Sequence, residues 1–346
     1  MSTPSRPSLV RHWLALAEEL VGRAAPRLDA LNLFPVPDAD TGTNMLATLT
    51  AARTAADACP AQDDAGAVLA HAGAAALDSA RGNSGMLLAV SLAGMAEPLR
   101  GRERVDAFAL AAAFGAADRA ARQALSDPRE GTILTVLSAA ARSLARSSTQ
   151  APDTPAVAGD ADPAVRLGPA VTLMLADCVQ AVEETESLLA PLTRAHVVDA
   201  GAVGLLWVFE ALRAVVTGTP VDEELATALH GYVEGAHAAE GEPAAAAEEP
   251  TEGAVEVMGT LALTPLAAAE LRRRLTEVGD AVILAPVGTA RDGQGRVPWR
   301  VHVHVPRAED AIGPLRAAGD VEGLAVTDLA EPSHGDDAAP DGCHGR

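Results

Sequence analysis

The chain has 346 residues and a formal net charge of −21 at pH 7, and it is 49% hydrophobic but only 2% aromatic. The strong negative charge disfavours a nucleic-acid backbone or an anionic membrane surface as the main partner. All 26 basic residues are arginine, which excludes a phosphate loop that uses lysine, a Schiff base and a lysine general base.

The composition also indicates the fold class and the compartment. Alanine-rich, aromatic-poor sequence favours closely packed helices over an all-β core. The three cysteines show no C-x-x-C spacing, no apolar leader opens the chain, and no run of 18 apolar residues is uninterrupted. We therefore expect a soluble, cytoplasmic protein with reduced thiols and no integral membrane segment.

The sequence pattern of the first 236 residues predicts one helical domain. Pro26 is expected to interrupt the first helix, and the polar stretch 147–166 is expected to form a loop. The pattern predicts an antiparallel eight-helix bundle or barrel over residues 1–236. Apolar residues recur at helical spacing near 8–26, 43–57, 64–80, 83–98, 105–125, 131–146, 168–190 and 201–217, and over a shorter stretch near 222–236.

A second, smaller α+β domain is predicted over residues 254–330. An acidic Ala/Pro-rich stretch, 237–253, has the composition of a linker, and the tail 331–346 is expected to be disordered. The order of the predicted elements is βαββαβ, which is the ferredoxin-like arrangement. Strands are expected at 255–263, 281–285, 299–305 and 323–329, and helices at 265–278 and 308–318.

The most informative stretch is NLFPVPDADTGTNM, residues 32–45. Its two prolines make the chain stiff and extended before Asp38 and Asp40. Two carboxylates about 4 Å apart repel by roughly 4 kcal/mol at an effective dielectric near 20, and a divalent cation reverses this repulsion. The hydroxyl-rich helix start that follows suits phosphate. Taken alone, however, the stretch is also explained as a turn in which Asp40 or Thr41 caps the helix.

Three further loop-to-helix junctions share this composition. They are ARGNSG at 80–85, EGT at 130–132 and DAGAVG at 199–204. One predicted helix separates each junction from the next. In an up-and-down bundle every second helix begins at the same end, so all four junctions are expected on one rim.

The rim predicts a site for Mg²⁺ and a nucleotide. Asp38 and Asp40 are the expected metal ligands and catalytic residues, because Mg²⁺ can bridge them to phosphate oxygens. Positioning and charge stabilisation then suffice for phosphoryl transfer. Arg81 is either a charge-neutralising cation or an ordinary surface arginine. The expected nucleotide contacts are Thr41, Thr43, Asn44, Gly82, Asn83, Ser84, Gly85, Thr132, Asp199 and Gly201.

The motifs NLFPVPDADTGTNM, ARGNSGMLL, EGTILTV and VVDAGAVGLL resemble the nucleotide-binding domain of bacterial fatty acid kinase catalytic subunits. More distantly, they are similar to the ADP-binding L subunit of dihydroxyacetone kinase. The resemblance covers roughly residues 8–236 and implies an eight-helix barrel whose acidic loop binds two Mg²⁺ ions with ATP. It implies Asp38 and Asp40 as ligands, with Asn32 as a third. Ala39 and Ala202 stand where that family has glycine.

The stretch WRVHVHV, residues 299–305, resembles the middle domain of the same family. His302 and His304 are two apart on a strand and so face the same side. The first and third strands of a ferredoxin-like sheet are neighbours, which brings Glu256 near them. The resemblance aligns Glu256 with a cysteine of a Cys-His-His, zinc-type site, so a metal site and purely structural histidines both remain open.

The leading hypothesis is an ATP- and Mg²⁺-dependent kinase subunit that phosphorylates a fatty acid presented by a separate binding protein. In this family a third domain docks the fatty-acid carrier, and we expect no counterpart of it within these 346 residues, which leaves two alternatives. One is a nucleotide-binding regulatory or scaffold protein without turnover, and the other is a small-polyol kinase subunit. We expect a homodimer, and we expect the partner to hold the acyl chain because the sequence shows no long apolar lining.

Overall fold

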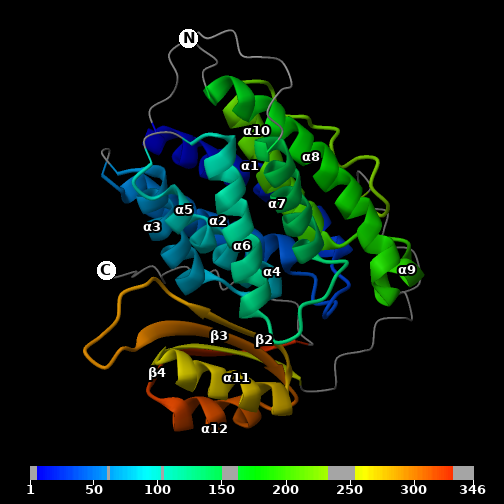
Figure 1. Cartoon of the computed structure of the whole chain (residues 1–346). Helices are drawn as coiled ribbons and strands as arrows, with labels where there is room; N and C mark the ends of the chain where they lie inside the picture. The colour runs from blue at the N-terminus through cyan, green and yellow to red at the C-terminus, as the bar shows by residue number, and fades with distance from the viewer. Residues whose placement is uncertain (1–5, 61–62, 103–104, 150–162, 233–253, 330–346) are drawn as a thin grey trace, which may run out of the picture.

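The computed structural model describes residues 6–60, 63–102, 105–149, 163–232 and 254–329. A helical domain lies above a four-stranded sheet, and two helices cover the other face of that sheet (Figure 1). This confirms the predicted class, a mainly helical protein with a smaller α+β domain. The predicted linker 237–253 and tail 331–346 lie outside the described residues.

Among the described residues, eight long helices and two short ones form the helical domain. Alanine is frequent in the core between them, which lets the helices approach closely. The helices are α1 (Arg6–Leu31), α2 (Thr41–Ala58), α3 (Ala65–Ser79), α4 (Gly82–Gly94), α5 (Ala96–Leu99), α6 (Ala107–Ala124), α7 (Ile133–Thr149), α8 (Pro163–Leu188), α9 (Ala190–Ala195) and α10 (Ala200–Thr217).

Two local expectations were wrong. Pro26 does not end α1, which continues to Leu31. Leu28 and Leu31 are buried there, and this packing outweighs the hydrogen bond that proline removes. The stretch near 222–236 forms turns rather than a helix in its described part, up to Tyr232. The predicted loop 147–166 is also shortened, because α7 extends to Thr149 and α8 begins at Pro163.

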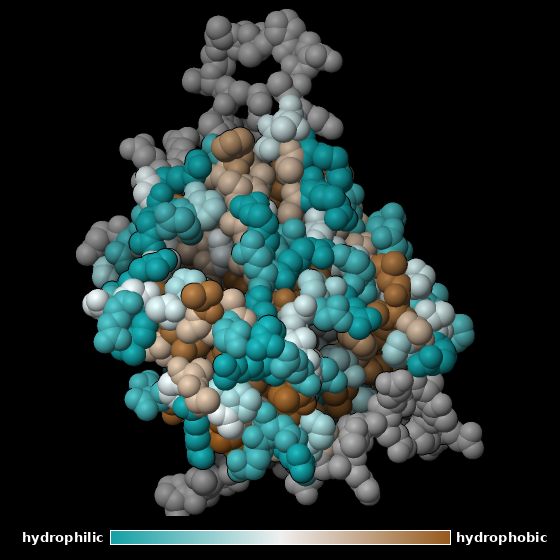
Figure 2. Space-filling view, turned by 60° about the horizontal axis from the view of Figure 1, so that its bottom comes forward, coloured by the Kyte–Doolittle hydropathy of each residue, from teal (hydrophilic) through white to brown (hydrophobic). Residues whose placement is uncertain are grey.

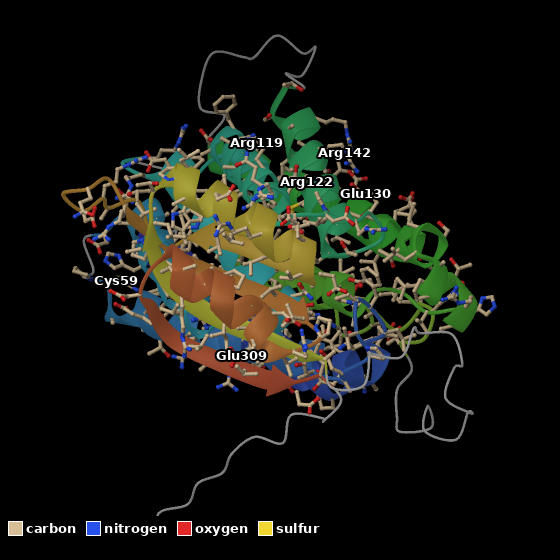
Figure 3. The ribbon with its side chains drawn as sticks, turned by 90° about the horizontal axis from the view of Figure 1, so that it is seen from below. Cys59, Arg119, Arg122, Glu130, Arg142 and Glu309 are labelled. Carbon is tan, nitrogen blue, oxygen red and sulfur yellow. The ribbon has the colours of Figure 1, made fainter. Side chains whose placement is uncertain are left out.

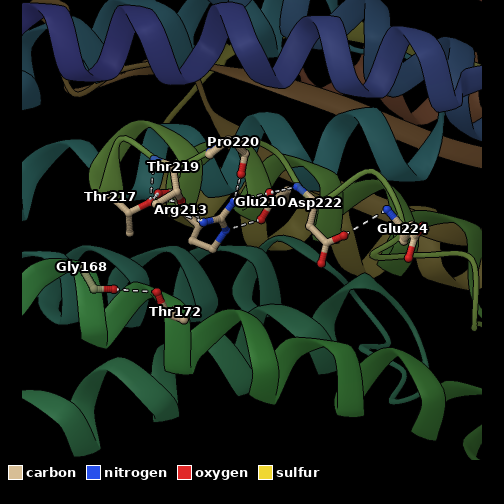
Figure 4. Close-up of polar contacts among 9 residues, drawn as sticks. All are labelled: Gly168, Thr172, Glu210, Arg213, Thr217, Thr219, Pro220, Asp222 and Glu224. Carbon is tan, nitrogen blue, oxygen red and sulfur yellow. Dashed lines mark hydrogen bonds and ion pairs between the residues drawn. The ribbon is translucent and has the colours of Figure 1, made fainter.

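A buried ion pair holds the turns after α10 in place. The fully buried carboxylate of Glu210 lies 2.6 Å from Arg213 and accepts a hydrogen bond from the backbone N–H of Asp222 at 2.7 Å. Arg213 in turn donates to the carbonyl of Pro220 at 2.6 Å (Figure 4). These contacts attach the beginning of the segment, at Pro220 and Asp222, to α10.

Helix α10 is the one described helix with the length and hydropathy of a membrane span. However, 78% of that window is buried inside the protein, as in the core helix of a soluble domain. The molecular surface seen in Figure 2 is largely hydrophilic, with hydrophobic residues showing in patches between polar ones.

The smaller domain has the predicted βαββαβ order. Its strands pair in the order β2-β3-β1-β4, all antiparallel, as in a ferredoxin-like sheet. Seen from below, its two helices lie across the sheet (Figure 3). The elements are β1 (Val255–Leu263), α11 (Pro265–Val278), β2 (Asp280–Pro286), β3 (Val297–Val305), α12 (Ala308–Ala318) and β4 (Val321–Asp328).

The two faces of the sheet have different partners. One face, which includes Val257 and Val303, packs with α11 and α12. The opposite face contributes Met258 and Ile283 to the core of the helical domain. The backbone N–H of Ser126, just after α6, donates to the carbonyl of Val282 in β2 at 3.0 Å. The two domains therefore share a packed interface.

Candidate functional site

The four predicted junctions meet at one rim of the helical domain. Gly82 begins α4 with a φ of +58°, and a Cβ atom there would lie 2.4 Å from Nδ2 of Asn44 in α2. A Cβ atom at Gly201 in α10 would lie 3.0 Å from Oγ of Ser84 in α4. Glycine is needed at both places because the helix starts approach so closely.

Asp199 joins two of these helix starts. It is fully buried and caps α10 by accepting from the N–H of Ala202 at 2.8 Å, and it also accepts from the N–H of Ile133 at the start of α7. Burial raises the pKa of Asp199 to about 7. Thr132, Asp199 and Gly201 do not line the cleft that contains Asp38 and Asp40, which is described below as the shared cleft. Asp199 joins α7 to α10, and the hydroxyl of Thr132 accepts from the N–H of Leu134 at 3.3 Å in the first turn of α7.

A second polar cluster shapes the start of α7. Arg122 pairs with Glu130 at 2.7 Å, and the hydroxyl of Thr135 donates to Glu130 at 2.6 Å. Although burial opposes it, hydrogen bonds from Thr135 and Arg122 lower the pKa of Glu130. Figure 3 shows Arg119 and Arg142 on the same side of the molecule. This cluster holds the third junction in place, but its residues do not line the shared cleft described below.

The acidic pair lies where the first junction enters α2. The carboxyl groups of Asp38 and Asp40 share a hydrogen bond, Asn32 donates to Asp38, and Asn44 donates to Asp40. Burial and the neighbouring Asp40 raise the pKa of Asp38 to about 8, and burial also raises the pKa of Asp40. Two half-buried carboxyl groups that lie side by side and resist ionisation are suited to a divalent cation.

Asp29 belongs to this rim and was missed by the sequence prediction. Its carboxylate accepts from the N–H of Gly42 at 2.6 Å and from the N–H and hydroxyl of Thr43 at 3.0 and 2.7 Å. It therefore caps α2, whereas Asp40 makes no side-chain capping bond. The hydroxyl of Thr43 is thus engaged by Asp29 and does not line the cleft. The prediction missed Asp29 because it ended the first helix at Pro26. In the structure α1 continues to Leu31, and this places Asp29 at the rim.

The two alanines that replace glycine differ in conformation. Ala39 adopts a φ of +54° between the two aspartates, where an L-residue costs roughly 1–2 kcal/mol. Ala202 lies buried in the first turn of α10 and is not among the residues with positive φ. Only the first replacement therefore strains the backbone.

Glu256 connects the two domains at this rim. Its Oε1 accepts from the N–H of Gly82 at 3.0 Å and lies 3.3 Å from Nδ1 of His302. The β1–β3 register pairs Glu256 with His304, and that face of the sheet packs against the helical domain. The histidine cluster, predicted as a separate second site, therefore adjoins the acidic pair.

The histidine cluster has the composition of a metal site. Glu256, His302 and His304 are buried, and their potential ligand atoms lie within 4.8 Å of one another. Burial lowers the pKa of both histidines to about 3, so the rings are neutral, and the 3.3 Å contact to Glu256 is no ion pair. Neither ring nitrogen of His302 has a hydrogen-bond partner. Neutral imidazoles with free nitrogens beside a carboxylate fit zinc.

These groups line one cleft, here called the shared cleft. Its cavity volume is about 30 Å³, which exceeds the roughly 10–15 Å³ that one water molecule needs. Gly85 lies behind it, where a Cβ atom would be 2.8 Å from Oγ1 of Thr48. The lining residues are Asn32, Phe34, Pro35, Val36, Asp38, Asp40, Thr41, Asn44, Gly82, Asn83, Ser84, Glu256, His304, Thr327, Asp328 and Leu329.

Comparison with known proteins gives matches that centre on the helical domain. The family model of the DAK2 domain matches residues 35–214. Protein YloV of Bacillus subtilis is 33% identical over 211 residues, which are 61% of this chain and 35% of that protein. Uncharacterized protein SH1689 of Staphylococcus haemolyticus is 32% identical over 198 residues, or 57% of this chain and 33% of its own length. The chain thus spans about a third of the length of these relatives.

Among solved structures, the dihydroxyacetone kinase of C. freundii is similar to this chain with a TM-score of 0.39 and 17% identity. The match covers 61% of this chain and 36% of that one.

Proposed function

The chain belongs to the DAK2 domain family, and from this premise we propose that it is an ATP- and Mg²⁺-dependent kinase subunit. The observation that carries the proposal is the half-buried pair Asp38 and Asp40, with raised pKa values, beside the starts of α2 and α4. Carboxylate oxygens are the protein ligands that Mg²⁺ prefers, and helix N-termini favour phosphate.

Each residue of the cleft has a distinct role in this proposal. Asp38 and Asp40 hold Mg²⁺, which neutralises phosphate charge when it is bound. Asn32 and Asn44 orient the two carboxylates through the hydrogen bonds that they donate. The start of α4 receives phosphate, for which Glu256 has to release the N–H of Gly82. The side chains therefore position charge, and no covalent protein intermediate is required.

We further propose that the phosphoryl acceptor is a fatty acid presented by a separate carrier protein. The resemblance of the four motifs to fatty acid kinase subunits supports this choice. A homodimer and a cytoplasmic location are part of the same proposal. So is a zinc ion held by Glu256, His302 and His304, whose free ring nitrogens support it.

Calorimetric titration with Mg²⁺ and a non-hydrolysable ATP analogue tests nucleotide binding. Asp40→Asn should weaken binding by at least about tenfold, since it removes a charged ligand. Asp57→Asn, at the exposed end of α2, is the matched control and should bind as the wild type does. Equal affinity in both variants would refute the metal assignment.

Turnover is tested separately, with palmitate, a fatty-acid-binding carrier and ATP, by trapping acyl phosphate with hydroxylamine. The kinase proposal expects hydroxamate that depends on both ATP and the carrier. Tight nucleotide binding without hydroxamate would support the regulatory alternative. Phosphate transfer to dihydroxyacetone without a carrier would support the small-polyol alternative.

Elemental analysis tests the zinc proposal. We expect one zinc ion per chain in the wild type and less than a tenth of that in His302→Ala. Equal, substoichiometric zinc in both proteins would assign the histidines a purely structural role. His12→Ala, on the exposed face of α1 and outside every group of side chains that could hold a metal among the described residues, is the control variant.

A further inference from the structure

A large cavity lies between the two domains, away from the shared cleft. Its volume is about 940 Å³, near the upper end of the roughly 300–1,000 Å³ of typical ligand pockets. Helices α3 to α6 form its wall on the helical side, and α11, β2 and β3 form the opposite wall. We call it the interdomain cavity.

The walls of the interdomain cavity are mainly apolar. Its larger apolar side chains are Leu77, Val90, Leu125, Leu284 and Trp299, and alanines supply much of the rest. Apolar side chains that face an empty space lose the dispersion attraction that neighbouring atoms would give them. An apolar ligand in the cavity would supply those contacts. The cavity therefore suits a ligand with a hydrocarbon body.

Arg272 of α11 adds a positive charge to this apolar lining. It donates to the carbonyl of Gln123 at 2.6 Å and to the carbonyl of Leu284 at 3.1 Å, and so connects the domains. Its Nε is buried and has no hydrogen-bond partner. Burial lowers the pKa of Arg272, and no carboxylate opposes that shift. A guanidinium in such surroundings favours an anionic partner.

The other arginines that line the cavity already have carboxylate partners. Arg100 pairs with Glu97 at 3.2 Å. Arg273 pairs with Glu270 at 2.9 Å and with Glu277. Among the described lining residues, Arg272 is therefore the arginine whose charge is left for a ligand. A single available cation matches a ligand with one anionic group better than a nucleotide, which carries several negative charges.

We propose that the interdomain cavity binds a long-chain carboxylate, with its head at Arg272 and its chain along the apolar walls. This goes beyond the kinase proposal and does not depend on it. Along α4, Gly82 at the shared cleft and Val90 at the cavity are eight residues apart, about 12 Å. No residue lines both spaces, so a carboxylate at Arg272 lies apart from Asp38 and Asp40, and the cavity is a lipid site separate from the shared cleft.

Fluorescence titration with cis-parinarate, a long-chain carboxylate that emits in apolar surroundings, tests the proposal on the whole chain. We expect saturation at one molecule per chain. Arg272→Gln should weaken binding roughly tenfold to a hundredfold, since it removes a charged hydrogen bond. Ala269→Trp fills the cavity from the exposed side of α11 and should abolish binding without disturbing the core.

Two variants on the same helix serve as controls. Arg274→Gln and Leu266→Trp alter exposed residues that do not line the cavity, and both should bind as the wild type does. Equal affinity in all four variants, or no saturation, would overturn the proposal. Displacement of the probe by hexadecanol as readily as by palmitate would refute the role of Arg272. Loss of a dimer in Ala269→Trp, without probe binding to the wild type, would instead identify a second copy as the occupant.

Discussion

Neutralising Asp38 should stabilise the metal-free protein, and the gain should grow with pH. The folded-state pKa of this carboxyl is raised by burial and by Asp40 to about 8, from the ordinary aspartate value of 3.8. The folded protein therefore holds the proton more tightly than the unfolded chain does. Stability is highest below the unfolded pKa and falls as the pH rises through the folded pKa.

The size of the effect follows from the same shift. Each pKa unit corresponds to about 1.4 kcal/mol. Between pH 5 and pH 8 the wild type should therefore lose about 4 kcal/mol of stability relative to Asp38→Asn, which carries no titrating group there. Mg²⁺ at a hundred times its Kd should restore about 2.7 kcal/mol to the wild type, through binding to the folded state alone.

Urea unfolding followed by tryptophan fluorescence measures both effects, at pH 5, 6, 7 and 8, with EDTA and with Mg²⁺. Asp57→Asn is the control and should track the wild type at every pH. The same pH dependence of stability in wild type and Asp38→Asn, measured in EDTA, would contradict the raised pKa of Asp38. The same gain from Mg²⁺ in both proteins would show that the ion binds elsewhere.

Three further substitutions test the backbone and the core by the same unfolding measurement. Ala39→Gly should stabilise the fold by about 0.5–1 kcal/mol, because glycine tolerates a φ of +54°; a loss of stability would contradict this. Gly42→Ala places a Cβ atom 2.4 Å from the carbonyl oxygen of Ala25 and should cost about 3 kcal/mol or more. The helix-interior control Gly115→Ala, with only Arg119 within 4 Å, should gain up to about 1 kcal/mol. Arg213→Met leaves the buried Glu210 without its cation (Figure 4) and should cost about 3–5 kcal/mol; an unchanged midpoint would refute that role.

Local sequence patterns were sufficient to predict most of the helices and strands. Helical periodicity and turn residues located the long helices, and strand alternation located the four strands. The prediction that every second helix begins at the same end placed the four junctions on one rim. The β1–β3 pairing of a ferredoxin-like sheet placed Glu256 opposite His304. These features follow from short-range periodicity and from a small set of allowed topologies.

Local pattern failed where packing overrides propensity. Pro26 looked like a helix end, but burial on both sides of it carries α1 on to Leu31 and brings Asp29 to the start of α2. The segment after α10 looked helical, but its described part forms turns, and Arg213 attaches its beginning to α10.

The sequence by itself determined the acidic motif, the class of ligand it favours and the order of the elements. Only the tertiary structure decided that Glu256 reaches the N–H of Gly82 across 174 residues of chain. It also decided that the acidic pair, Glu256 and His304 line one cleft, and that an apolar cavity lined in part by Arg272 opens between the domains. The reason is physical. A domain interface depends on the shape and polarity of both surfaces that come into contact. Hydrophobic periodicity within one segment predicts which side of it is buried, but not which surface it packs against.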